Sequence, residues 1–158
     1  MLETAGEGTR SRIAYVRCAV LLAFALSGGV AAQGTTKFKA RLSRAAIDAA
    51  ELSRVAGLGS MTAELKDNTL TIKGTFSGLL SPATKAHLDR GAEKGLRGRM
   101  MFDLTVSPGT GGTISGTVTL SASQVNDLRL GRFYVQVDSE KAPDGNLWGW
   151  LLPEETRK

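Results

Sequence analysis

From residue 35 onward, the chain is a succession of short runs of alternating apolar and polar residues, separated by Gly, Pro, Asn, Asp and Ser. Successive side chains of a β-strand point to opposite faces, so this alternation predicts strands with one buried face, joined by tight turns. The clearest case is the pair of runs at 61–65 and 70–76, which flank Asp67-Asn68 and predict a β-hairpin. About seven or eight such runs predict an all-β, antiparallel two-sheet sandwich or a flattened Greek-key barrel.

Two segments depart from the alternation, and each predicts a short helix or helical turn. Residues 43–55 contain four alanines together with Ile47 and Leu52, and they begin at Ser43, which has the chemistry of an N-cap. Residues 121–131 begin at a serine and end at Gly131, a suitable stop. Further turns are expected at 107–112 and at 143–146, where the sequence reads Pro-Asp-Gly-Asn.

The first 32 residues have the organisation of a secretory signal peptide. Three arginines precede an apolar run from Cys18 to Leu26, and small residues follow it up to Ala32. The apolar run is short for a membrane span, which needs about 20 residues, so we expect cleavage after Ala32, with an uncleaved signal anchor as the alternative. The sequence thus predicts a periplasmic or secreted domain over 33–158, in contact with a membrane only if the N-terminal segment is retained.

The length, charge and cysteine content of the chain argue against several classes of protein. The chain of 158 residues has room for one domain of ordinary size. Its net charge of +5 is modest and dispersed, so we do not expect nucleic-acid binding. Cys18 is the only cysteine and lies within the signal segment, so the mature domain has neither a disulfide nor a cysteine metal site.

Three segments resemble the chordin domain (CHRD) family. That family carries Ala-His-Ile-His-x-Gly, then Tyr-Val-Asn-Val-His-Thr, then a closing Pro-x-Gly-Glu-Ile-Arg-Gly-Gln-Leu. The corresponding segments here are Ala86-His87-Leu88-Asp89-Arg90-Gly91, Tyr134-Val135-Gln136-Val137-Asp138-Ser139 and Pro143-Asp144-Gly145-Asn146-Leu147-Trp148-Gly149-Trp150-Leu151. The resemblance spans about 37–152 and implies an extracytoplasmic β-sandwich, without implying an enzymatic reaction.

Of the three histidines in the family pattern, only His87 is present, and Asp89 and Asp138 occupy the positions of the other two. His87 and Asp89 are two residues apart on a strand and therefore share a face. If the strands are neighbours, Asp138 joins them, either in a structural hydrogen-bond cluster or around a hard divalent cation. With one imidazole there are too few ligands for a copper or zinc centre, so we expect no metal and no cofactor.

Catalytic motifs are absent from the sequence: there is no Gly-x-Ser-x-Gly segment, and His87 is the only histidine. In the last run, Leu147, Gly149 and Leu151 match the inward positions of the family pattern, so the resemblance implies that Trp148 and Trp150 lie on the outer face, where the family has polar residues. Exposed indoles are enriched at protein interfaces. We therefore expect a non-enzymatic domain that binds a protein partner through Trp148 and Trp150, as an accessory subunit of a membrane-associated complex. The alternatives are a metal-binding protein or metal-dependent enzyme centred on His87, Asp89 and Asp138, and a soluble ligand-binding module.

Overall fold

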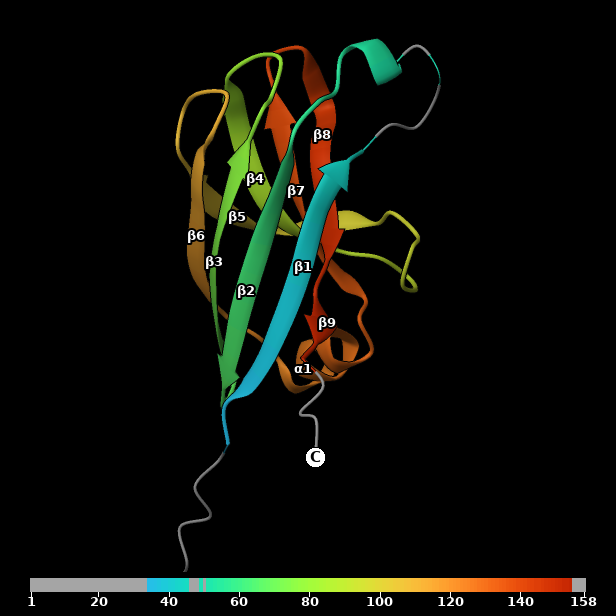
Figure 1. Cartoon of the computed structure of the whole chain (residues 1–158). Coiled ribbons are helices and arrows are strands. Elements are labelled where there is room, and N and C mark those ends of the chain that lie inside the picture. The colour runs from blue at the N-terminus through green and yellow to red at the C-terminus, as the bar shows by residue number, and fades with distance from the viewer. Residues whose placement is uncertain (1–33, 46–48, 50, 155–158) are drawn as a thin grey trace, which may run out of the picture. The chain divides into compact units, whose positions relative to one another are not determined.

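The computed structural model describes residues 34–45, 49 and 51–154. It contains nine strands, one 3₁₀ helix and one α-helix (Figure 1). In chain order the elements are β1 (Thr36–Arg44), η1 (Glu51–Ser53), β2 (Leu58–Lys66), β3 (Thr69–Ser77), β4 (Ala83–Arg90), β5 (Arg99–Val106), β6 (Gly112–Thr119), α1 (Ala122–Arg129), β7 (Phe133–Ser139), β8 (Ala142–Trp150) and β9 (Leu152–Pro153). The predicted signal segment lies outside the described residues. Among those that are described, no helix is long and apolar enough to cross a membrane.

Eight of the strands form one closed antiparallel barrel, so the all-β prediction is confirmed in its barrel form. The strand order is β2-β3-β6-β5-β4-β7-β8-β1, and pairing of β1 with β2 closes the circle. The short β9 pairs with the lower half of β1, beside β8 (Figure 1). Closure leaves only short stretches of unpaired strand edge, which limits the hydrogen-bonding groups exposed to other chains.

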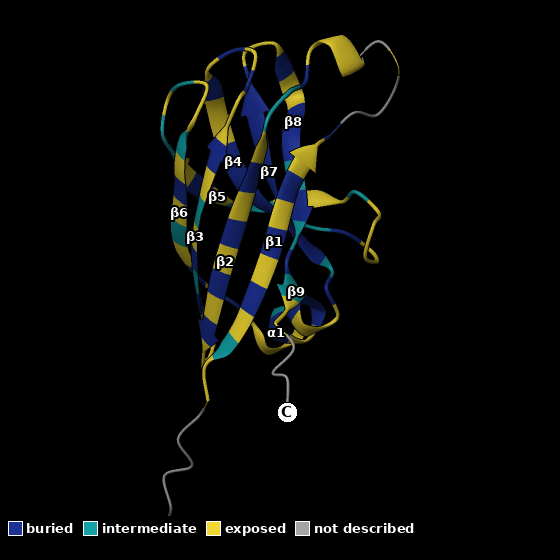
Figure 2. Cartoon of the chain, in the orientation of Figure 1, coloured by how far each residue is buried: buried dark blue, intermediate teal, exposed yellow. Residues whose placement is uncertain are grey.

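The core follows directly from the alternation in the sequence. Strand β2 is buried at every second residue, and Figure 2 shows buried and exposed bands alternating along β1 and β2. The inward side chains form one apolar cluster with members from β1 through β8. Its largest fully buried members include Phe38, Leu42, Met61, Ile72 and Leu147. Burial of these side chains is the main force that holds the barrel together, because the domain has no disulfide.

Helix α1 confirms the prediction made for residues 121–131. Ser121 is its N-cap: the Ser121 hydroxyl accepts from the Gln124 amide, and the Gln124 side chain accepts from the Ser121 amide, which together form a capping box. Gly131 follows the helix with a φ of 70°, as expected for a helix stop. Buried Asp127 ties the helix to the barrel through ion pairs with Arg90 at 2.7 Å and Arg132 at 3.0 Å.

The hairpin prediction at 61–76 is also confirmed. Strands β2 and β3 pair along their whole length, and Asp67 adopts a left-handed φ of 55° in the turn between them. The prediction for residues 43–55 was wrong at its start, because Ser43 lies in β1 and pairs with Trp148 instead of capping a helix. A single 3₁₀ turn at Glu51–Ser53 is the helical structure that the described part of this segment contains.

The turn predicted at 143–146 was wrong. Strands β7 and β8 are joined at Glu140 and Lys141, and the Pro-Asp-Gly-Asn residues lie inside β8. Gly145 has a φ of 128°, a value that favours glycine, near the point where the β7–β8 register shifts. The glycine is therefore required by an irregularity within the strand and not by a turn. Asn146 is fully buried, and its amide donates to the carbonyl of Ala56 at 2.7 Å. Contacts with a segment far along the same chain therefore outweigh the local preference of these residues for a turn.

Candidate functional site

The registers of three neighbouring strands line up the residues singled out in the sequence. On β4, β7 and β8, His87 lies opposite Gln136, which lies opposite Trp148. In the next outward-facing row, Asp89 lies opposite Tyr134, which lies opposite Trp150. The side chains between these rows, including Leu88 and Val135, belong to the core cluster. The two rows therefore occupy the outer face of the barrel.

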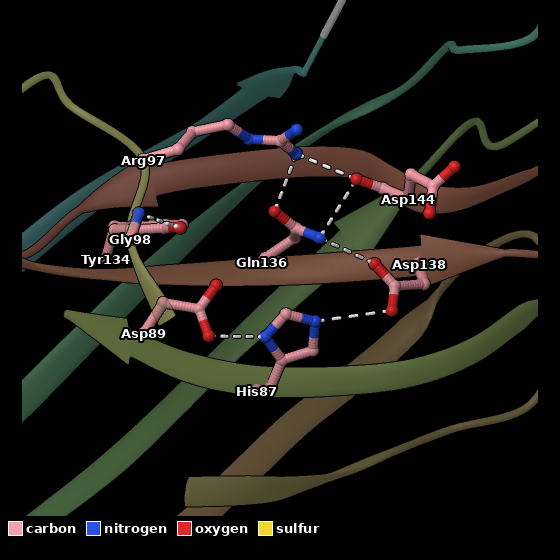
Figure 3. Close-up of polar contacts among 8 residues, drawn as sticks. All are labelled: His87, Asp89, Arg97, Gly98, Tyr134, Gln136, Asp138 and Asp144. Atoms are coloured by element: carbon pink, nitrogen blue, oxygen red, sulfur yellow. Dashed lines mark hydrogen bonds and ion pairs between the residues drawn. The ribbon is translucent and has the colours of Figure 1, made fainter. Parts of the chain in front are cut away.

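His87 lies between two carboxylates (Figure 3). Its Nδ1 is 2.7 Å from Asp89 Oδ1, and its Nε2 is 3.3 Å from Asp138 Oδ2. All three residues are buried on this face, so the sequence-based expectation that they come together holds in the structure. The contacts are those of a hydrogen-bonded and ion-paired cluster.

The pKa of His87 is raised from 6.5 to about 9. Burial disfavours the charged ring, but the hydrogen bonds to Asp138 and Asp89 and the negative charges of both carboxylates more than offset this. At neutral pH the ring is an imidazolium that donates from both nitrogens, one proton to each aspartate.

The polar network continues from Asp138 across β7 to the 91–98 loop. Gln136 Nε2 donates to Asp138 Oδ1 at 2.9 Å, and Arg97 Nη2 donates to Gln136 Oε1 at 2.8 Å (Figure 3). Arg97 also donates to the backbone carbonyl of Asp144 at 2.8 Å. This chain of hydrogen bonds links β4, β7, β8 and the loop. It fixes the position of the Arg97 guanidinium on the outer face.

Three aromatic rings pack beside this network. Tyr134 lies at 4.6 Å from Trp150 and 6.1 Å from Trp148 between ring centroids, and the two indoles are 6.4 Å apart. The Arg97 guanidinium lies 5.3 Å from the centre of the Trp148 ring, within cation–π range. We call Tyr134, Trp148, Trp150 and Arg97 the aromatic face. Both tryptophans lie outside the core, each partly buried.

Tyr134 is the buried base of the aromatic face, with a relative exposure of 1 %. Burial raises the pKa of its hydroxyl, and the nearby Asp89 carboxylate acts in the same direction, so the phenol stays neutral. The hydroxyl oxygen accepts from the Gly98 amide at 3.1 Å, which ties the 91–98 loop to β7 (Figure 3). The loop also approaches both indoles, with Arg97 over the Trp148 ring and Gly91 beside Trp150.

An open hollow of about 440 Å³ lies beside the aromatic face, over the polar cluster, and neither Trp148 nor Trp150 lines it. Its wall combines apolar and charged groups, with contributions from β4, β5, β7, β8 and the 91–98 loop. The residues that line it are His87, Asp89, Arg97, Gly98, Met100, Tyr134, Gln136, Asp138, Pro143 and Asp144.

A family model for the CHRD domain matches residues 38–151. The chain belongs to the CHRD domain family. The match begins in β1 and ends just after β8, so it covers every strand of the closed barrel. The resemblance that the sequence motifs indicated is thereby confirmed. No curated protein and no solved structure matches the chain.

In this CHRD domain, the residues at the three histidine positions of the family pattern are in direct contact. Asp89 and Asp138, which replace two of those histidines, are the two carboxylates that flank His87. Among the described residues, no group of three His, Cys, Asp or Glu side chains has an arrangement suited to a metal ion. His87 has both nitrogens engaged, so a cation would have to displace a proton and break an ion pair to bind there.

Sequence reasoning missed the contribution of Arg97 to the site of this CHRD domain. It lies 39 residues from Gln136 in the chain, in a loop that carried no motif, so no local signal could identify it. Tyr134, Gln136 and Asp138 alternate with Val135 and Val137 along β7, but alternation alone does not show which of the three packs on the indoles. The strand registers decide this.

Proposed function

We propose that this CHRD domain is a non-enzymatic binding module that docks a protein partner through the aromatic face. The observation that carries the proposal is the pair of partly exposed indoles, Trp148 and Trp150, supported from below by Tyr134 and from the side by Arg97. Trp, Tyr and Arg are the residues that most often dominate binding energy at protein interfaces. Here they are adjacent on one face.

The aromatic face is held in place before any partner arrives. Its rings lie on the paired strands β7 and β8, and hydrogen bonds from Arg97 and Gly98 fix the loop beside them. Ordered side chains lose little conformational entropy on association, which favours binding. The adjoining hollow supplies charged groups that can select a partner by complementarity.

The chemistry of the polar cluster supports binding rather than catalysis. A general base needs a free nitrogen and a pKa near the working pH, whereas His87 is an imidazolium whose two nitrogens both face carboxylates. Its role in this proposal is structural: it neutralises Asp89 and Asp138 beside the aromatic face.

We propose that the domain is periplasmic or secreted, which the predicted signal segment over 1–32 supports. We propose that its partner belongs to a membrane-associated complex, in which the domain is an accessory subunit. Retention of the N-terminal segment would tether the domain to the membrane and raise its effective concentration near such a partner.

The test is replacement of both indoles, Trp148→Ser with Trp150→Ser. The wild-type protein is isolated from native membranes under mild conditions, and the proteins that accompany it are identified and quantified by mass spectrometry. The double variant should recover its partner at least about tenfold less well, because each buried indole at an interface is commonly worth about 2 kcal/mol or more.

The matched control is Leu58→Ser, which removes an exposed apolar side chain at another place on the barrel, where Leu58 is 62 % exposed. This variant should retain the partner. Circular dichroism and thermal melting of all three proteins establish that the barrel is intact. A folded double variant that co-purifies with the partner at the wild-type level would refute the proposal, as would a wild-type protein that recovers no partner.

A further inference from the structure

Two segments that are far apart in the sequence are neighbours on the side of the barrel. Residues 90–100 contain the loop between β4 and β5, which projects from the barrel (Figure 1). Residues 127–132 contain the end of α1 and the turn into β7. The Gly91 amide donates to the Arg132 carbonyl at 2.9 Å, which joins the two segments. We call 90–100 and 127–132 together the basic surface.

The positive charge of the domain is concentrated on the basic surface. The surface has six Lys and Arg residues against two acidic residues, whereas the rest of 34–154 has nine against ten. One of the two acidic residues, Asp127, is buried. Charge that is dispersed along the sequence is therefore gathered in space. The six basic residues are Arg90, Lys94, Arg97, Arg99, Arg129 and Arg132.

Four of these six side chains have no acidic partner among the residues that the structure describes. Asp127 pairs with the other two, Arg90 and Arg132. Arg97 donates to an amide oxygen and to a backbone carbonyl, both of which are neutral. The remaining three, Lys94, Arg99 and Arg129, take part in none of the ion pairs of the described chain.

Two of the arginines also repel each other. Arg90 and Arg99 lie directly opposite across the β4–β5 pair, where like charges destabilise a sheet. The charge of Arg90 is offset by Asp127, whereas Arg99 is exposed and has no such carboxylate in the described part of the chain. An anion that approached Arg99 would relieve this repulsion.

Apolar side chains stand exposed among the charges. Leu96, Met100 and Leu130 are 56 %, 55 % and 53 % exposed, and they are three of the six large apolar residues that are exposed in the described chain. A Cβ on Gly95 would meet no other atom within 4 Å, so the loop stands clear of the barrel next to Leu96. The basic surface therefore combines unpaired positive charge with a projecting apolar side chain.

We propose that the basic surface docks onto an anionic lipid bilayer, with Leu96 entering the headgroup region. Attachment to a bilayer is favoured by apolar area that leaves water and by the attraction of Lys and Arg to anionic headgroups. An acidic protein surface would satisfy the charges, but it would give the exposed leucines no apolar medium to enter. The chemistry of the surface matches a bilayer in both respects.

This contact goes beyond the proposed docking of a protein partner. The sequence alone offered membrane contact only through a retained N-terminal segment, and the basic surface supplies a second route. Arg97 belongs to both the basic surface and the aromatic face, so the docked domain would hold its indoles close to the membrane.

The test uses the exported protein as the cell produces it, with vesicles of phosphatidylcholine alone or of equal parts of phosphatidylcholine and phosphatidylglycerol. Binding is measured by flotation. At low salt the protein should bind the anionic vesicles at least about tenfold more strongly than the neutral ones, because several basic side chains act together. High salt should remove most of this difference, since it screens exposed charges.

A pair of double variants locates the contact, and both share the N-terminal segment of wild type. Lys94→Gln with Arg99→Gln should weaken binding to the anionic vesicles by more than about tenfold, because each basic side chain near such a surface contributes about fivefold. Lys66→Gln with Lys73→Gln removes the same charge from exposed positions of β2 and β3, and it should bind as wild type does. Thermal melting establishes that both variants are folded.

Insertion is measured at position 96 itself. In a Cys18→Ser background, Leu96→Cys carries an environment-sensitive fluorophore, and Leu58→Cys is the matched control because Leu58 is also an exposed leucine. The emission of the label at 96 should shift to the blue with anionic vesicles. The label at 58 should not respond.

Several outcomes would overturn the proposal. Equal loss of binding in the two charge variants would show that net charge matters and this surface does not. A label at 96 that stays in water would show that the loop does not insert. If the Lys94/Arg99 variant binds vesicles normally but loses a co-purifying protein, the surface belongs to an acidic protein partner. No protein partner takes part in the vesicle experiment, so its failure leaves docking through the aromatic face to the Trp148/Trp150 test.

Discussion

Substitution of His87 by Gln tests the ion-paired cluster most directly. Glutamine can still donate a hydrogen bond to one carboxylate, but it carries no charge at any pH. His87 is the only histidine of the chain, so its titration contributes one distinct term to the pH dependence of folding. The comparison of wild type with the variant isolates that term, because every other titrating group is common to both proteins.

The magnitude follows from the shift in the pKa of His87, from 6.5 to about 9. At about 1.4 kcal/mol per pKa unit, protonation of His87 stabilises the folded state by about 3 kcal/mol, which is the net of the cost of burial and the larger gain from the two carboxylates. The ring is about 10 % exposed, so solvent screens this contribution only weakly.

The sign is fixed by which state holds the proton. Below pH 6.5 the imidazole is protonated in both the folded and the unfolded chain, and the full contribution is present. Between pH 6.5 and about 9, only the folded state keeps the proton, so stability falls by about 1.4 kcal/mol per pH unit. Above about pH 9 the contribution is lost.

The assay is urea unfolding of both proteins at intervals from pH 6 to pH 10. The free energy of unfolding of wild type, relative to the variant, should decline by about 3 kcal/mol over this range, most of it between pH 6.5 and 9. A difference that stays constant with pH would refute the reasoning, because it would mean that folded His87 titrates as it does in the unfolded chain.

Two further predictions concern packing. Asn146→Ala should lower the free energy of unfolding by about 1 to 3 kcal/mol in urea titrations. The reason is that the Ala56 carbonyl and the Ser139 hydroxyl lose their buried hydrogen-bond partner. An unchanged urea midpoint would contradict this prediction. Gly149→Ala should destabilise the barrel by about 1 to 3 kcal/mol in thermal melts, since a Cβ there would lie 2.6 Å from the Arg41 carbonyl oxygen, next to the paired residues of β8 and β1. A melting temperature equal to wild type would show that the two strands can separate at little cost.

Much of the fold was predictable because the relevant signals are local. Alternation assigned Leu147 and Leu151 to the core and both indoles to the outer face, and the structure agrees. The capping chemistry of Ser121 defined where α1 begins. The turn predicted at 143–146 failed for a reason that is not local. Pro143 lies in a part of β8 that β1 does not pair, so a strand can include it there without losing a hydrogen bond to β1.

The candidate site was only partly predictable. The two-residue period of a β-strand predicts which face of its strand each of His87, Asp89 and Asp138 occupies. Their mutual contacts depend on β4 and β7 being neighbours in one particular register. Arg97 reaches the site from a loop distant in sequence and had no identifiable signal.

By itself, the sequence determined which apolar side chains of the strands face the core, that the chain is all-β, and which family it belongs to, because these depend on periodicity and short motifs. Only the tertiary structure decided that the barrel closes, which residues meet across strands, and that β5 and β6 separate after two residue pairs. The physical reason is that register and strand order are set by the packing of the whole core, and no single segment contains that information.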